Sequence, residues 1–327
     1  MNMQTSIKDA PYARPDHPTA KGSIIQLKDI QKKLPLRVLT EEDWRHWTTR
    51  GYVIIRNVVP ATQVQAVIDM LWVFQEMDPN DQNTWYRPQL RAHKMTELNN
   101  TGMVEVYNHQ SLWDNRQLQK VYDIFVDLWD REDLWTAIDR ANLNPPNKVA
   151  RETGKKDGFI HLDVDSSARP LPIGVQGVLS LSVQDIETGG FQCVPDLFAE
   201  LESWSDRQPA DANPFKPDIT GYDVVNTTMN PGDLLIFNSL QPHGVRPNRS
   251  FDRVRLAQYI SMFPADYENE AVRKERIRLW QEQAAPIGDA FPGDPRDFER
   301  KHFTRAKLNN LGQKLLGLEP WTLPPTN

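Results

Sequence analysis

The residues best suited to chemistry are a histidine and an aspartate two positions apart, His161 and Asp163, in the extended run GFIHLDVD. Side chains two apart on a strand project from the same face, so we expect the imidazole and the carboxylate to point together. His243, which follows the run PGDLLIFNSLQP, is the best candidate for a third ligand. Two imidazoles and one carboxylate form a triad that leaves open positions on non-haem Fe(II). The pattern therefore predicts a metal centre at these three residues.

A plainer interpretation stays open. The chain contains 7 histidines, so a single His-x-Asp can arise by chance as a hydrogen-bonded structural pair. A second acid, Asp165, extends the motif and by alternation shares the face of Asp163. It is either a structural surface acid or a residue that contacts substrate or hydrogen-bonds a ligand.

Two arginines follow His243 in the strand-like run RVRLAQYIS. Alternation places Arg253 and Arg255 on one face together with the small Ala257. An arginine on a small, inward face requires an anion, and its planar fork suits a carboxylate. Both are candidate anion-binding residues, with an ordinary salt bridge at the start of a strand as the alternative.

The predicted elements that position these residues change from mainly helical to mainly extended near residue 147. Before it, boundary signals and apolar spacing predict helices from Thr40 to Gly51, from Pro60 to Phe74 and around 118–128, with a short strand GYVIIRNVV after the first. After it, short β-type runs are separated by turn residues: KVARETG, GFIHLDVD, IGVQGVLSLSVQDI, FQCVP, DVVNTTM, GDLLIFNS and RVRLAQYISMF. Helical pattern returns in ENEAVRKERIRLWQEQAA and near 307–316.

This order predicts an α+β protein with a sandwich or barrel whose N-terminal helices cover one sheet face. We expect a polar, proline-bearing arm over 1–38 and a single domain over 39–327. No internal repeat is visible.

Composition excludes several classes of protein. The chain has 327 residues and a formal net charge of −6, without a basic stripe, so nucleic acid is not an expected partner. No apolar run reaches the roughly 18 residues of a membrane-spanning helix, and the first residues lack a secretion signal. The single cysteine, Cys193, cannot form an intramolecular disulfide. We expect a cytoplasmic protein with a small-molecule substrate; the oligomeric state is left open.

Taken in order, these motifs resemble the phytanoyl-CoA dioxygenase-like branch of the Fe(II)/2-oxoglutarate-dependent oxygenases, from about Leu39 to Phe263. The similar segments are the helix–strand–helix opening LTEEDWRHWTTRGYVIIRNVVPATQVQAVIDML, the iron-binding HLD, the strand IETGGFQCVP and the segment PGDLLIFNSLQPHGVRPNRS. Family members usually continue Val-Pro with Gly-Ser-His, whereas this chain reads PDLF from Pro195. That departure concerns loop contacts on the substrate side and leaves the metal ligands untouched.

The resemblance implies a double-stranded β-helix, or jelly roll, over about 147–263, with a helical extension over 264–327. It implies Fe(II) on His161, Asp163 and His243, with 2-oxoglutarate and O₂ as cosubstrates. Arg255, or Arg253 in its place, would hold the far carboxylate of 2-oxoglutarate. The implied reaction is hydroxylation or another oxidation of a small metabolite, with release of succinate and CO₂.

Two other functions stay open from the sequence. One is a jelly-roll metalloenzyme whose triad holds Zn or Mn for non-oxidative chemistry. The other is a non-enzymatic jelly roll that binds a small molecule. Dependence of turnover on O₂ and 2-oxoglutarate separates these from the oxygenase.

Overall fold

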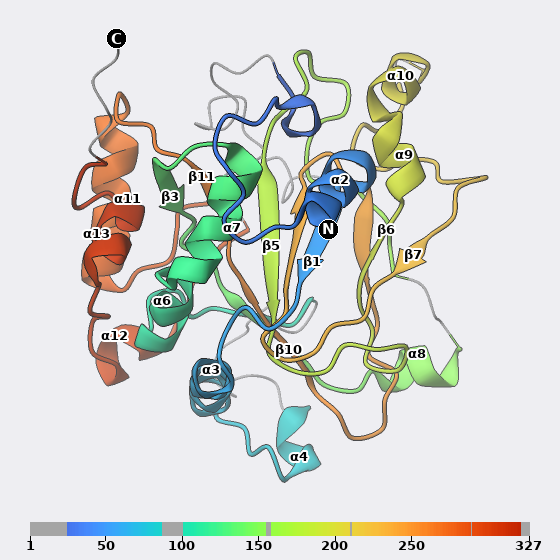
Figure 1. Ribbon diagram of the computed structural model, residues 1–327. Coiled ribbons are helices and arrows are strands. Elements are labelled where there is room, and N and C mark those ends of the chain that lie inside the picture. Colours follow the sequence, from blue (N-terminus) through green and yellow to red (C-terminus); the bar gives the residue numbers. More distant parts are fainter. Residues whose placement is uncertain (1–24, 87–100, 155–157, 210, 289, 322–327) are drawn as a thin grey trace.

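Antiparallel sheets surrounded by helices make up the computed structural model (Figure 1), which describes residues 25–86, 101–154, 158–209, 211–288 and 290–321. The larger sheet has six strands in the order β1-β8-β5-β10-β4-β2, and every pairing in it is antiparallel. The strands are β1 Tyr52–Ile55, β8 Leu234–Asn238, β5 Val175–Ser180, β10 Arg255–Tyr259, β4 Ala141–Asn144 and β2 Met103–Val104. Three of them precede residue 147, so the N-terminal part of the chain supplies strands as well as helices.

A second sheet of three strands has the order β7-β6-β9, with β7 Val225–Asn226, β6 Gly190–Cys193 and β9 His243–Arg246. Strands β11 Met262–Pro264 and β3 Leu134–Thr136 form a separate pair. Phe191 of β6 packs with Leu235 and Phe237 of β8 in one buried cluster. The two larger sheets therefore face each other across these side chains.

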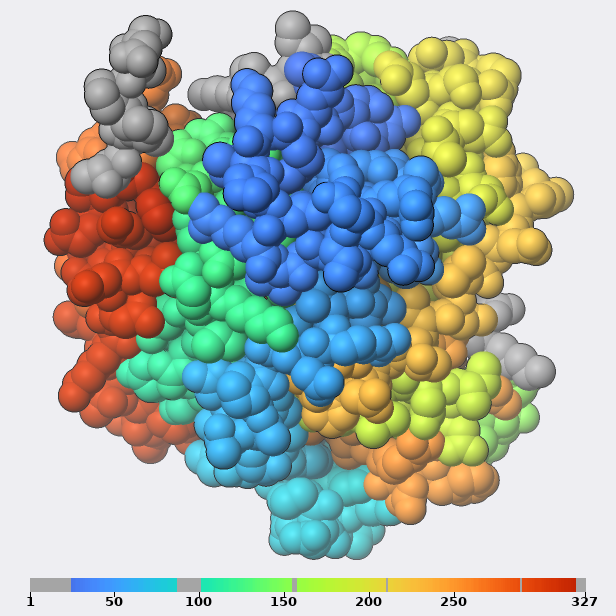
Figure 2. All heavy atoms as spheres, in the orientation of Figure 1, coloured from blue at the N-terminus to red at the C-terminus, as the bar shows by residue number. Residues whose placement is uncertain are grey.

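The other face of the six-stranded sheet carries the main core. On β8, Leu234 and Ile236 belong to the main cluster, whereas Leu235 and Phe237 face the second sheet, as strand alternation requires. The main cluster also contains side chains of three N-terminal helices: α2 Glu41–Arg50, α3 Ala61–Phe74 and α7 Gln119–Trp129. In Figure 2, the blue and green N-terminal segments cover this side of the molecule.

Capping residues and apolar spacing explain where the first helices form, as the sequence predicts. The Thr40 side chain accepts a hydrogen bond from the Asp43 N–H (3.1 Å), and the Asp43 carboxylate accepts one from the Thr40 N–H (2.9 Å), which is a capping box. Gly51 ends α2 at φ +75°, a conformation that glycine adopts without strain. The predicted helix after Pro60 is α3, with Val64, Val67, Leu71 and Phe74 buried. These predictions are confirmed.

Two of the predicted strands are wrong. KVARETG forms the helix α8 Lys148–Glu152, because the side chain of Asn147 accepts a hydrogen bond from the Ala150 N–H (2.9 Å) and caps it. GFIHLDVD is not a regular strand: a single bridge pairs His161 with His243, and the chain then bends.

The C-terminal part is helical, as predicted, with α11 Glu270–Glu282 and α13 Asn310–Leu316. The shorter helical segments are η2 Leu27–Asp29, α4 Gln82–Trp85, α6 Gln110–Arg116, α9 Pro195–Ala199, α10 Leu201–Asp206 and α12 Phe298–His302. Within the described ranges, no helix has the length and apolar character needed to cross a membrane.

The described part of the predicted N-terminal arm lies against α7. The N–H groups of Lys33 and Leu34 donate to the Asp130 carboxylate (2.8 and 2.9 Å), and Leu27 is buried in the main cluster. Residues 1–24 of the predicted arm lie outside the described residues.

Candidate metal centre

Backbone pairing brings His161 to the start of β9. The N–H of His161 donates to the carbonyl of His243 (2.8 Å), and the N–H of His243 donates to the carbonyl of His161 (3.0 Å). This closed pair fixes the two Cα atoms on facing strand positions, although the two residues are far apart in the sequence. Both imidazoles can therefore point to one side of the bridge.

The bend after His161 turns Asp163 toward both imidazoles. The Nε2 atom of His161 lies 3.2 Å from Asp163 Oδ1, and the Nε2 atom of His243 lies 3.4 Å from Asp163 Oδ2. The three candidate ligand atoms lie within 4.8 Å of one another. In the part of the chain that the structure describes, this is the one cluster of three or more histidine, cysteine or acidic side chains close enough to hold a metal ion.

Neighbouring groups fix the orientation of the ligands. The Nδ1 atom of His243 lies 2.9 Å from the carbonyl oxygen of Gln241, which can only accept, so Nδ1 carries the proton and Nε2 presents its lone pair. The Nε2 group of Gln176, on β5, donates to Asp163 Oδ2. The ring of Phe237 packs against His243 at a centroid distance of 4.4 Å. The donor atoms therefore point toward a common space.

The charge states of two of these groups suit a divalent metal. Burial lowers the pKa of His243 to about 4, so its imidazole is neutral at neutral pH. Burial acts to raise the pKa of Asp163, but the nearby His243 and hydrogen bonds from His161 and Gln176 outweigh it and hold that pKa well below its usual range. The site thus presents a carboxylate and a neutral imidazole, the forms that bind metals.

The two predicted arginines differ in their surroundings. Arg255 on β10 is 5% exposed, and its Nη1 donates to the carbonyls of Thr188 (3.0 Å) and Arg246 (2.7 Å). Within the described ranges no carboxylate pairs with it. Burial lowers the pKa of Arg255 to about 10, so the side chain remains a cation at neutral pH. A buried cation held by neutral carbonyls is suited to binding an anion.

Arg253 has ordinary ion pairs instead. Its guanidinium contacts the carboxylates of Asp185 (2.7 Å) and Glu187 (2.6 Å), and its side chain is 39% exposed. The salt-bridge alternative from the sequence therefore describes Arg253, whereas no ion pair of Arg255 is found within the described ranges.

Asp165 does not join the cluster. Its Oδ1 atom accepts hydrogen bonds from the N–H (2.9 Å) and the hydroxyl (2.6 Å) of Ser167. These contacts define a local turn, which agrees with the structural alternative for this acid.

Sequence reasoning missed Gln176, the side chain that contacts Asp163. The only signal was its alternate position in the strand run VQGVLS, where it shares a face with Val178. Nothing local distinguishes such a residue from any other polar strand position, because its partner comes from a different segment.

The fold and the site define a class: a mixed helix-and-sheet protein whose antiparallel sheets hold a two-histidine, one-carboxylate group able to bind a metal. No protein-family model matches the chain. A curated protein of Dictyostelium discoideum, named "Putative phytanoyl-CoA dioxygenase", is 24% identical over an alignment length of 314, and the alignment covers 82% of this chain and 84% of that protein. The resemblance to phytanoyl-CoA dioxygenase-like proteins is therefore confirmed.

Two solved structures share the fold. The GlcNAc Inducible Gene 2 protein of Candida albicans is 14% identical over 88% of this chain and 79% of that chain, with a TM-score of 0.58. A hypothetical protein of Escherichia coli is 16% identical over 85% of this chain and 82% of that chain, also with a TM-score of 0.58. At these identities the likeness concerns the fold alone.

Proposed function

We propose that this protein is an Fe(II)- and 2-oxoglutarate-dependent oxygenase that oxidises a small-molecule metabolite, by hydroxylation in the simplest case. The observation that carries the proposal is the convergence of two imidazole Nε2 atoms on the two oxygens of Asp163. The name of the Dictyostelium relative supports the same chemistry.

The donor set fits Fe(II). His161, Asp163 and His243 would hold the metal through two nitrogens and one oxygen, which is the ligand set of non-haem iron oxygenases and leaves positions open for other ligands. The chemistry supplied by bound Fe(II) is the activation of O₂ at the expense of 2-oxoglutarate, which is converted to succinate and CO₂. The carbonyl of Gln241 keeps the lone pair of His243 directed at the metal position.

Arg255 is the residue that we propose for the far carboxylate of 2-oxoglutarate. Its guanidinium is hydrogen-bonded to the carbonyl of Arg246, three residues along β9 from His243. At about 3.3 Å per residue, these strand positions are about 10 Å apart, a gap that a short dicarboxylate between a metal and an arginine side chain can span. A bidentate carboxylate on Arg255 would also compensate its buried charge.

The fold that we propose is a jelly roll within one oxygenase domain over 39–327. Two facing antiparallel sheets, with the candidate ligands at the edge of the smaller one, support this arrangement. His243 is 6% exposed, and such burial suits a reaction that must exclude water.

The test is a spectrum. Anaerobic protein with Fe(II) and 2-oxoglutarate is expected to give a visible charge-transfer band, and His161→Ala to abolish it. Asp165→Ala is the matched control, since this acid lies two residues from Asp163 and its carboxylate bonds only to Ser167 among the described residues. A band that survives His161→Ala, or succinate formation that does not require 2-oxoglutarate and O₂, would contradict the proposal.

A further inference from the structure

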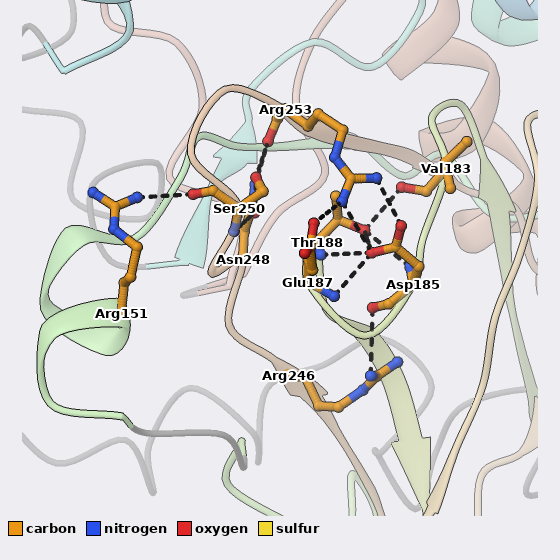
Figure 3. A network of polar contacts seen from close by, with 9 residues as sticks. All are labelled: Arg151, Val183, Asp185, Glu187, Thr188, Arg246, Asn248, Ser250 and Arg253. Carbon is orange, nitrogen blue, oxygen red and sulfur yellow. Dashed lines mark hydrogen bonds and ion pairs between the residues drawn. The ribbon is translucent and has the colours of Figure 1, made fainter.

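A tight turn, shown in Figure 3, lies between β5 and β6. The carbonyl of Thr188 in this turn accepts a hydrogen bond from Nη1 of Arg255 (3.0 Å). One oxygen of Asp185 accepts hydrogen bonds from the N–H groups of Glu187 and Thr188, both at 2.9 Å. The hydroxyl of Thr188 donates to the carbonyl of Val183 (3.0 Å). The carboxylate of Asp185 thus forms the centre of the turn and fixes the backbone at Thr188.

Arg253, two residues before the start of β10, forms ion pairs with this turn. In Figure 3 its guanidinium faces the Asp185 carboxylate, with Nη1 at 2.7 Å from Oδ2 and Nη2 at 3.4 Å from Oδ1. Its Nη2 also donates to Glu187 (2.6 Å). Burial acts to raise the pKa of Asp185, but the hydrogen bonds from Arg253 and from the turn hold it well below its usual range. The turn therefore contains an ionised carboxylate whose two oxygens contact the two Nη atoms of Arg253.

The same turn is pressed against the end of β9. Gly189 has φ +74°, and a Cβ atom there would lie 2.3 Å from the carbonyl oxygen of Arg246. Arg246 in turn donates from Nη2 to the carbonyl of Thr227 (2.7 Å). Glycine is thus required both for the conformation and for the close approach.

The turn and the end of β9 each provide one carbonyl that accepts a hydrogen bond from Arg255. The two acceptors of its Nη1 atom are the carbonyl of Thr188, which belongs to the turn, and the carbonyl of Arg246, against which the turn packs. A shift of the turn would move the Thr188 carbonyl directly, whereas the Arg246 carbonyl is also held by the pairing of β9 with β6. The direction of the Arg255 guanidinium therefore depends in part on the turn that the Asp185–Arg253 ion pair holds.

We propose that Asp185 and Arg253 are positioning residues for 2-oxoglutarate: their ion pair holds the turn whose Thr188 carbonyl helps to aim Arg255 at the far carboxylate. The inference rests on the proposed function, because it assigns Arg255 to that carboxylate. It gives Arg253 a role different from the direct contact that the sequence allowed. Neither Asp185 nor Arg253 touches 2-oxoglutarate in this arrangement.

The experiment measures 2-oxoglutarate and metal binding separately. 2-Oxoglutarate is titrated calorimetrically into Mn(II)-loaded protein, and Mn(II) affinity is measured in parallel by competition with a chelator. Arg253→Ala and Asp185→Ala are expected to weaken 2-oxoglutarate binding by roughly tenfold with unchanged Mn(II) affinity. Asp185→Asn keeps an acceptor for the turn but loses the charge, so its effect should be smaller, and Arg253→Lys should recover part of the loss.

The control is Arg278→Ala. Arg278 is also 39% exposed and also pairs with two carboxylates, Glu275 (2.7 Å) and Glu282 (2.5 Å), but it lies on α11. It should change neither affinity. Hydrogen exchange of the Glu187 and Thr188 amides should rise in Asp185→Ala, which removes their acceptor, and in Arg253→Ala, which no longer holds that acceptor in place.

The outcomes separate the two proposals. No binding of 2-oxoglutarate to the unaltered Mn(II)-loaded protein would overturn the proposed function. Binding that Arg255→Ala abolishes but that Arg253→Ala and Asp185→Asn leave unchanged would overturn only the positioning role. Equal losses of melting temperature and of both affinities in all the turn variants would also overturn it, since they would show a purely structural ion pair.

Discussion

Asp163 is the most constrained side chain of the candidate centre. One of its oxygens faces His161, and the other faces both His243 and the amide of Gln176. The sequence could predict the three ligand types, because their chemistry is local to each residue. It could not predict Gln176, because folding alone places that amide beside the bend at Asp163.

This arrangement makes Gln176→Ala a test of ligand orientation. Without the amide, Asp163 is free to rotate, and we expect affinity for Mn(II) to fall by roughly 10- to 100-fold. Chelator competition measures the change. Gln65→Ala is the matched control, since Gln65 also donates to an aspartate, Asp69 (2.7 Å), but on the exposed surface of α3. Equal affinities of the two variants would count against a role of Gln176 at the metal.

Helices and strands differ in how much of them the sequence predicts. The capping box at Thr40 and the stop at Gly51 are local, so α2 was predicted with both ends. Strand β4 reads ANLN and was missed, because its pairing with β10 brings Arg255 opposite Asn144 from a distant segment. The helix α8 was missed for the opposite reason: one local cap, Asn147, outweighed the extended character of its neighbours. Local sequence patterns therefore fail to predict two kinds of element: a strand that depends on long-range pairing, and a helix that depends on one capping residue.

The cap of α2 gives an element-scale prediction. Thr40→Ala removes the acceptor of the Asp43 N–H and one partner of the Asp43 carboxylate, and should lower the free energy of unfolding by about 1 kcal/mol. Thr40→Ser keeps the hydroxyl, and serine caps helices at least as well as threonine, so this variant should show no loss of stability. Urea denaturation measures both. Mn(II) affinity should not change, and a change in it would contradict the view that this cap only stabilises its helix.

At the scale of the whole molecule, a buried carboxylate ties the C-terminal helices to the N-terminal part of the chain. Glu299 on α12 accepts hydrogen bonds from the N–H groups of Tyr107 (2.9 Å) and Asn108 (2.6 Å). Burial raises its pKa from 4.5 to about 7, and these two bonds offset only part of that effect. The junction between the two parts of the chain is therefore sensitive to pH.

The sign of this dependence follows from proton binding. Between pH 4.5 and 7 the folded protein binds more protons at Glu299 than the unfolded chain does, so the free energy of unfolding falls as pH rises through that interval, by up to about 3 kcal/mol. Glu299→Gln cannot ionise. Urea denaturation is measured at pH 4.5 and at pH 8 on protein treated with a metal chelator. Between these pH values, the free energy of unfolding of the variant should rise by that amount relative to the unaltered protein. A penalty for the lost acceptor should lower it equally at both pH values. Glu202→Gln, on the exposed surface of α10, should show no such gain. The free energies of unfolding of Glu299→Gln and of the unaltered protein could instead differ by the same amount at both pH values. That result would mean that Glu299 ionises at its ordinary pKa in the folded protein and that the junction tolerates a buried charge.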